Sequence, residues 1–186
     1  HDVQVLTPMH KGVLGVANLN RELQRVLNPR SESARATPSG LHEGDKVMQI
    51  RNNYEKDVYN GDMGRIAAVN SEDNSLQVDF DGQLVAYQSH EFDELTLAYA
   101  VSVHKSQGSE YPAVVMPLVT QHFPLLQRNL LYTAISRARK LVVLVGTPKA
   151  MYIAIKNDKV QQRYTHFMNR LAGVEPLQHS LGIEEP

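Results

Sequence analysis

The stretch SVHKSQGSEYPAVVMPL, residues 102–118, places a dense polar segment directly before an uninterrupted apolar run. The apolar part, residues 113–118, carries no charge, and a second run of the same kind, LVVLVG, occupies residues 141–146. Continuous apolar runs of this length are typical of strands that are buried on both faces of a parallel sheet. The two runs therefore predict strands of a parallel sheet, with the polar segment immediately before the first of them.

Helical and strand patterns elsewhere complete an α/β interpretation. Residues 3–7 form a short apolar run that stops at a proline, and residues 12–27 carry apolar side chains at helical spacing. A helix is predicted over residues 125–140, between the two buried strands, and another is predicted to begin within residues 149–155. Since the strands are predicted to be buried on both faces, we expect a parallel sheet with helices on both faces.

Residues 41–96 have a different pattern, with short strand-like runs separated by turn signals. Asp81-Gly82 is a strong hairpin signal, because a two-residue turn that matches strand twist needs positive φ. About five short strands are predicted here, which indicates a small antiparallel barrel of the SH3-like type inserted into the α/β part. Residues 28–40, rich in Pro, Ser and Arg, are predicted to be a connection, and residues 173–186 a loose tail.

Length and composition exclude several classes of protein. The chain has 186 residues, of which 42% are hydrophobic and 21% charged, which suits one globular domain carrying a smaller one. It contains no cysteine and no apolar run of about 18 residues. Disulfide scaffolds, thiolate metal sites, cysteine nucleophiles and membrane-spanning helices are therefore excluded. We expect a cytoplasmic protein without a secretion signal.

Charge is distributed unevenly along the chain, although the net formal charge is only -1. Residues 41–97 contain 4 basic and 12 acidic side chains, a net charge of -8. The remainder contains 15 basic and 8 acidic side chains, a net charge of +7. Because only a positive surface attracts polyanions over distance, the flanking part rather than the barrel is expected to do so.

The polar segment offers groups that could bind a nucleotide. Lys105 and Gln107 supply donors for phosphate oxygens, and Gly108 lets a backbone N–H approach closely. Glu110 can accept a hydrogen bond from a ribose hydroxyl. From the residues alone, an ordinary polar loop with a satisfied histidine is the alternative interpretation.

A second candidate segment is LLYTAISRAR, residues 130–139. On the predicted helix, Arg137 shares a face with Leu130 and Ala134, which is the side expected to pack inward. A guanidinium group there needs a carboxylate or phosphate partner, because an unpaired buried charge is costly. A phosphate ligand and a buried salt bridge are both open at this point, and Arg139 could be an ordinary solvated charge.

Together the two segments resemble motifs V and VI of superfamily 1 helicases. VSVHKSQGSEYPAVV, residues 101–115, resembles motif V of the RecD-like branch, and LLYTAISRAR resembles its motif VI. Ser102 and Ser136 stand where this family often has Thr, a change that keeps the hydroxyl group. The resemblance continues through three further ranges, which are residues 8–20, 44–64 and 163–171.

The resemblance implies the second RecA-like motor domain of a 5′-to-3′ DNA helicase of the exodeoxyribonuclease V alpha-subunit type. Residues 1–40 and 97–172 would form that domain, and residues 41–96 the SH3-like insertion. ATP and Mg²⁺ are the implied cofactors, and the implied partners are single-stranded DNA, a first RecA-like domain and, in some complexes, nuclease or helicase subunits. The chain contains no G-x-x-x-x-G-K-[ST] segment and no Walker B strand, so we expect it to be inactive alone.

The resemblance also assigns roles to individual residues. Arg137 resembles the arginine finger that stabilises charge on the transferred γ-phosphoryl group, a role worth about 10³ to 10⁵ in rate. The other assignments are nucleotide contacts by Gln107, Gly108 and Glu110, and contacts to the single-strand backbone by Ser102, His104 and Lys105.

Two other functions remain open: a non-catalytic clamp whose barrel binds DNA or a protein, and the helicase part of a conjugative relaxase. The charge of the barrel argues against tight DNA binding through phosphates. Stacking on Tyr54, Tyr59 or Tyr87 could contribute, although aromatic side chains in a small barrel are more often core. The 8 histidines show neither H-x₃-H nor H-E-x-x-H spacing, so no metal site is predicted.

Overall fold

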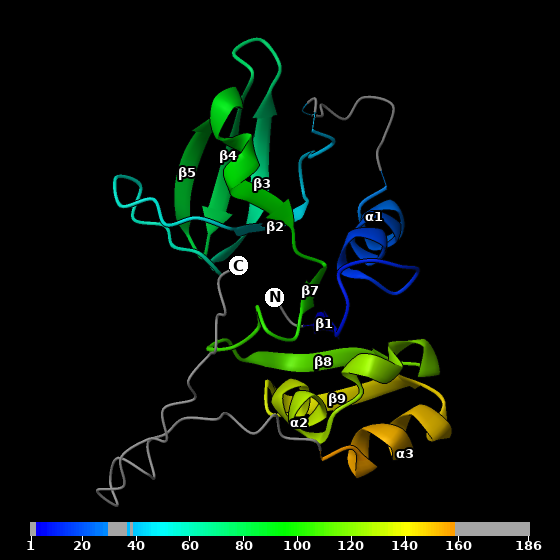
Figure 1. Ribbon diagram of the computed structural model, residues 1–186. Helices are drawn as coiled ribbons and strands as arrows, with labels where there is room; N and C mark the ends of the chain where they lie inside the picture. The colour runs from blue at the N-terminus through cyan, green and yellow to red at the C-terminus, as the bar shows by residue number, and fades with distance from the viewer. Residues whose placement is uncertain (1–2, 30–36, 38, 159–186) are drawn as a thin grey trace, which may run out of the picture.

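The computed structural model describes residues 3–29, 37 and 39–158, and its strands form two separate sheets (Figure 1). All strands of the second sheet lie in the chain between α1 (Val16–Leu27) and β7 (Ala100–Ser102). The first sheet is therefore assembled from two separated segments, which confirms an α/β fold with an inserted antiparallel unit. The limits of the two parts stay predictions, and the predicted tail, residues 173–186, lies outside the described residues.

The first sheet is parallel and has the strand order β7-β1-β8-β9. Its remaining strands are β1 (Val3–Thr7), β8 (Tyr111–Leu118) and β9 (Ala138–Gly146). β1 lies inside the sheet, because its Val5 pairs with Ala100 of β7 on one side and with Val115 of β8 on the other. The three apolar runs of the sequence thus form strands of one parallel sheet, as predicted, and they lie next to one another in the order β1-β8-β9.

Helices cover the two faces of this sheet to different extents. On one face, α2 (Arg128–Ile135) and α3 (Pro148–Lys156) pack over β8, and Met116 of that strand is buried in the same core as Leu131. On the opposite face the Thr7 hydroxyl donates to the Leu14 carbonyl, so the segment leading into α1 covers β1. Two 3₁₀ helices in the described residues, η1 (Ser89–Glu94) and η2 (Thr120–Leu125), complete the connections.

Two predicted helices are shorter than expected. The helix predicted over residues 125–140 ends at Ile135, and β9 begins three residues later, because the Tyr111 N–H donates to the Arg137 carbonyl at 2.8 Å and pulls the chain into the sheet. The helix predicted over residues 12–27 begins only at Val16. A Cβ atom on Gly15 would lie 2.5 Å from the Lys11 carbonyl, so the tight turn before α1 requires glycine.

β9 is not buried on both faces as predicted. Leu141, Val143 and Val145 alternate along the strand onto one face and are 55%, 38% and 54% exposed. Leu144, on the other face, packs against the core beneath α2 and α3. β9 is one of the two edge strands of this sheet within the described part of the chain. The composition of an apolar run does not distinguish an edge strand from a central one.

The second sheet is antiparallel, with the order β5-β4-β3-β2-β6. The strands are β2 (Lys46–Gln49), β3 (Met63–Asn70), β4 (Ser75–Phe80), β5 (Gln83–Gln88) and β6 (Leu95–Leu97). The predicted Asp81-Gly82 hairpin is confirmed, with φ of 51° and 100° at the two turn residues. Tyr87 is fully buried in the core of this unit, beside Ile66 and Val78.

A buried polar junction fixes the barrel against the parallel sheet. The Asp45 carboxylate is fully buried and accepts hydrogen bonds from Gln24 and Asn28 of the α1 region and from the Tyr99 hydroxyl before β7. Next to it, Lys46 Nζ donates to Gln4 Oε1 at 2.7 Å. Burial, and secondarily the charge of Arg65, lowers the pKa of Lys46 to about 8.

Candidate nucleotide and nucleic-acid site

The polar segment after β7 forms a compact turn that is stabilised by its own hydrogen bonds. Ser102 is buried, and its Oγ accepts the Lys105 N–H at 3.3 Å. The fully buried Ser106 hydroxyl donates to the Val103 carbonyl at 2.7 Å, and Gly108 adopts a φ of 89°. Serine and glycine at these positions are therefore explained first by the backbone path.

This turn divides the predicted contact residues into buried and exposed ones. His104, Lys105, Gln107 and Gly108 are exposed, so their side chains or backbone can reach a ligand. Ser102 is only 2% exposed, and its hydroxyl supports the turn. His104 and Lys105 are therefore exposed on this turn, and the buried Ser102 stabilises the turn beneath them.

Arg137 lies against the same turn, although it follows α2 instead of belonging to it. Its backbone carbonyl accepts the Tyr111 N–H, and its Nη1 donates to the Ser109 carbonyl at 3.2 Å. Nη2 donates to Ser136 Oγ at 3.3 Å. Within the described residues, Arg137 forms no ion pair, and its buried Nε has no hydrogen-bond partner. No salt bridge to an acidic side chain is therefore found in this part of the chain.

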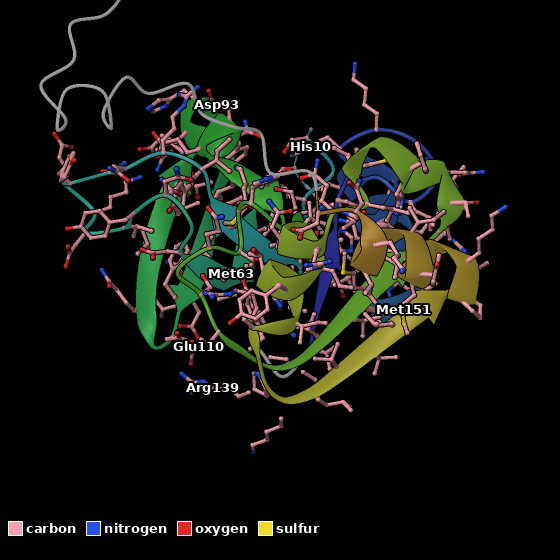
Figure 2. All side chains as sticks on the ribbon, turned by 60° about the horizontal axis from the view of Figure 1, so that its bottom comes forward. His10, Met63, Asp93, Glu110, Arg139 and Met151 are labelled. Carbon is pink, nitrogen blue, oxygen red and sulfur yellow. The ribbon has the colours of Figure 1, made fainter. Side chains whose placement is uncertain are left out.

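Glu110 and Arg139 lie side by side where β8 and β9 begin (Figure 2). Arg139 Nε donates to Glu110 Oε2 at 2.7 Å, and both side chains are more than half exposed. The sequence interpretation missed this partner of Glu110, because it placed Arg139 on a helix. The parallel register that aligns Tyr111 with Ala138 is the signal that pairs the two residues.

The acidic and imidazole groups of the described residues do not gather into a metal centre. No group of three or more histidine or carboxylate side chains is placed to hold a metal ion in this part of the chain. Likewise, none of the helices in the ranges 3–29 and 39–158 is long and apolar enough to cross a membrane.

Among the described residues of the barrel, no basic side chain is without a contact. Each of its four basic side chains contacts a group of the chain itself: Lys46 with Gln4, Arg51 with Asp93, Lys56 with Glu91, and Arg65 with the Gly44 carbonyl. Tyr87 is core, whereas Tyr54 and Tyr59 are exposed. Among the described residues, the barrel therefore offers no basic side chain without a contact, whereas Lys105 on the turn after β7 is exposed.

The chain matches two protein families over two successive ranges. Residues 19–80 match the family described as the ATP-dependent RecD-like DNA helicase SH3 domain, and residues 97–145 match the UvrD-like helicase C-terminal domain. The second match contains the turn after β7, α2 and Arg137. The chain belongs to the RecD-like family of superfamily 1 DNA helicases. The expected resemblance to this family is thereby confirmed.

Individual relatives match this RecD-like chain over most of its length. It is 40% identical over 169 residues to the ATP-dependent RecD2 DNA helicase of Deinococcus radiodurans, covering 91% of this chain and 23% of that protein. It is 28% identical over 162 residues to the RecBCD enzyme subunit RecD of Haemophilus influenzae, covering 87% and 24%. The chain thus spans about a quarter of the length of these curated relatives.

Solved structures support the fold. A Pif1 helicase from Bacteroides, crystallised with ADP-AlF3 and single-stranded DNA, has a TM-score of 0.52 and 18% identity, with 91% of this chain and 44% of that one covered. A Pif1 structure described for unwinding at forked double-stranded DNA has a TM-score of 0.54 and 21% identity, with 77% and 38% covered. At these identities the likeness concerns the architecture.

Proposed function

We propose that this RecD-like chain completes the ATP site of a DNA helicase from its second motor domain and contacts single-stranded DNA. The observation that carries the proposal is the contact of the Arg137 guanidinium with the Ser109 carbonyl. One turn then presents His104 and Lys105 to solvent and anchors Arg137 at its other end. A nucleotide bound by Arg137 and a DNA strand bound by Lys105 would then both contact the turn formed by residues 102–110.

The groups around Arg137 suit a phosphate. One guanidinium N–H is engaged by Ser109, which orients the side chain, while the buried Nε lacks a partner within the described residues. A planar guanidinium with free donors matches phosphate oxygens. Gln107 and the Gly108 backbone would add donors beside it. ATP supplies the γ-phosphoryl group that is transferred to water.

Glu110 is proposed to accept a hydrogen bond from the ribose. Its present partner, Arg139, forms an exposed ion pair with it, and exposed pairs contribute only about 0 to 1 kcal/mol. A hydroxyl group can therefore compete for the carboxylate. The described residues contain no metal-ligating cluster, so the Mg²⁺ that accompanies ATP would be held by the first motor domain.

The contribution of the chain would be electrostatic. Arg137 would oppose charge that develops on the γ-phosphoryl group, an effect that is largest in the transition state. His104 and Lys105 would contact the phosphates of the strand. The chain alone would not hydrolyse ATP. A nuclease complex as partner and a cytoplasmic location stay predictions.

The decisive experiment is Arg137→Ala in the helicase that contains this segment, with Arg51→Ala, an exposed arginine of the barrel that pairs with Asp93, as the matched control. We expect DNA-stimulated ATP hydrolysis to fall by about 10³ or more for Arg137→Ala, with DNA affinity nearly unchanged. Arg137→Lys should rescue little, because an ammonium group lacks the planar fork. If Arg137 is only structural, Arg137→Ala will lower the melting temperature, and hydrolysis at low temperature will persist.

A further inference from the structure

The loop between β2 and β3, residues 50–62, carries two tyrosines that belong to no core. Tyr54 is 76% exposed and Tyr59 is 42% exposed, and their rings meet edge to face with centroids 5.9 Å apart. Figure 1 shows this loop, in cyan, projecting from the side of the barrel. Large aromatic side chains are enriched at surfaces that bind partners.

Hydrogen bonds hold this loop in one shape. Asn53 and Val58 exchange backbone hydrogen bonds of 2.8 and 3.1 Å, and Val58 is only 1% exposed. The Tyr59 N–H donates to Asp62 Oδ2 at 2.7 Å, and the Tyr59 hydroxyl donates to Asp57 Oδ1 at 2.6 Å. The aromatic faces are therefore positioned in advance, which lowers the ordering cost of binding.

The surroundings of the two rings are negative. Glu55, Asp57 and Asp62 belong to the same loop and are exposed, and none of them forms an ion pair among the residues that the structure describes. The hydrogen bond and charge of Asp57 raise the pKa of Tyr59, as expected in a negative field. The loop therefore has carboxylates to offer a cation.

The two basic side chains of the loop, Arg51 and Lys56, already form ion pairs with acidic residues. Arg51 Nη2 lies 3.0 Å from Asp93, and Lys56 Nζ lies 2.6 Å from Glu91. A phosphate backbone approaching the loop would meet unpaired carboxylates without a free cation, which is unfavourable. A cation would meet both the carboxylates and the negative faces of the tyrosine rings.

We propose that the loop of residues 50–62 is a docking surface for an extended, arginine-rich segment of a protein partner. Guanidinium groups would stack on Tyr54 and Tyr59 and pair with Glu55 and Asp62. Arginine fits better than lysine, because its planar group both stacks on aromatic faces and binds carboxylates in a bidentate manner. The proposal concerns a surface outside the ATP and DNA contacts and does not depend on them.

The test uses the 186-residue chain and a dye-labelled peptide of alternating arginine and glycine, with binding followed by fluorescence anisotropy. Glu55→Gln/Asp62→Asn removes two charges while the amide of residue 62 can still accept the Tyr59 N–H. Glu72→Gln/Asp73→Asn removes two exposed charges at the distant β3–β4 turn and is the matched control. We expect the loop variant and Tyr54→Ala to bind about tenfold more weakly, and the control to change less than about twofold.

Tyr54→Phe and a lysine-glycine peptide sharpen this test. The phenylalanine variant keeps the ring and should retain the affinity, whereas the lysine peptide should bind more weakly than the arginine peptide. Absence of peptide binding, or equal weakening by the control variant, would overturn the proposal. So would binding of an oligothymidylate that Tyr54→Ala weakens without changing the slope of log affinity against log salt, because the loop would then stack nucleobases.

Discussion

The barrel and the parallel-sheet part of this RecD-like chain differ in what their cations contact. Every basic side chain of the barrel contacts a group of the chain itself. On the parallel-sheet part, the exposed Lys105 ammonium forms no ion pair among the described residues. Arg137 contacts Ser109 and Ser136 there and keeps a buried Nε without a partner in the described residues. We therefore expect an anion to bind at the exposed turn of the parallel-sheet part rather than on the barrel.

The polar junction between the two parts offers the strongest test of this contrast. Asp45→Ala should lower the free energy of unfolding by about 3 kcal/mol, because it leaves several buried donors without their acceptor. Urea denaturation measures the change. Asp93→Ala, which removes an exposed ion pair, is the control and should cost less than about 1 kcal/mol. Similar losses for both variants would mean that the junction is not a specific link.

The lowered pKa of Lys46, at the same junction, predicts that the free energy of unfolding depends on pH. Its pKa is about 8 in the folded protein and near the ordinary value of 10.5 when unfolded, so the unfolded state binds more protons between these values. The contribution of Lys46 to the free energy of unfolding is therefore lowest below pH 8 and rises toward pH 10.5. Relative to Lys46→Met, the native protein should gain about 2 kcal/mol between pH 7 and pH 10 in chemical denaturation. A constant difference would contradict the burial of this ammonium group.

The smallest expected effect concerns the exposed cation on the turn. Lys105→Ala should weaken binding of single-stranded oligonucleotide about tenfold at low salt and reduce the slope of log affinity against log salt by about 0.7. Fluorescence anisotropy over a salt series measures both quantities. Arg51→Ala in the barrel should leave affinity and slope unchanged, since that guanidinium is paired with Asp93. If Arg51→Ala weakened oligonucleotide binding more than Lys105→Ala, the barrel rather than the turn after β7 would be the DNA-binding region.

Local patterns in the sequence were enough for most of the architecture. The apolar runs predicted the parallel strands, and Asp81-Gly82 predicted a hairpin whose positive φ values the structure contains. The uneven charge indicated two units with different surfaces, and the two motif-like segments pointed to the family and to the turn after β7. These features depend on residues close together in the chain, where spacing alone constrains the backbone.

Long-range contacts decided the rest. The sequence could not predict that α2 ends before Arg137, because the strand contact with Tyr111 that ends it joins residues 26 positions apart. Nor could it distinguish β9, with one face exposed, from a central strand. The partner of Glu110, the donors around Asp45 and the occupied cations of the barrel all follow from which distant side chains the fold brings together, and local spacing carries no information about those distances.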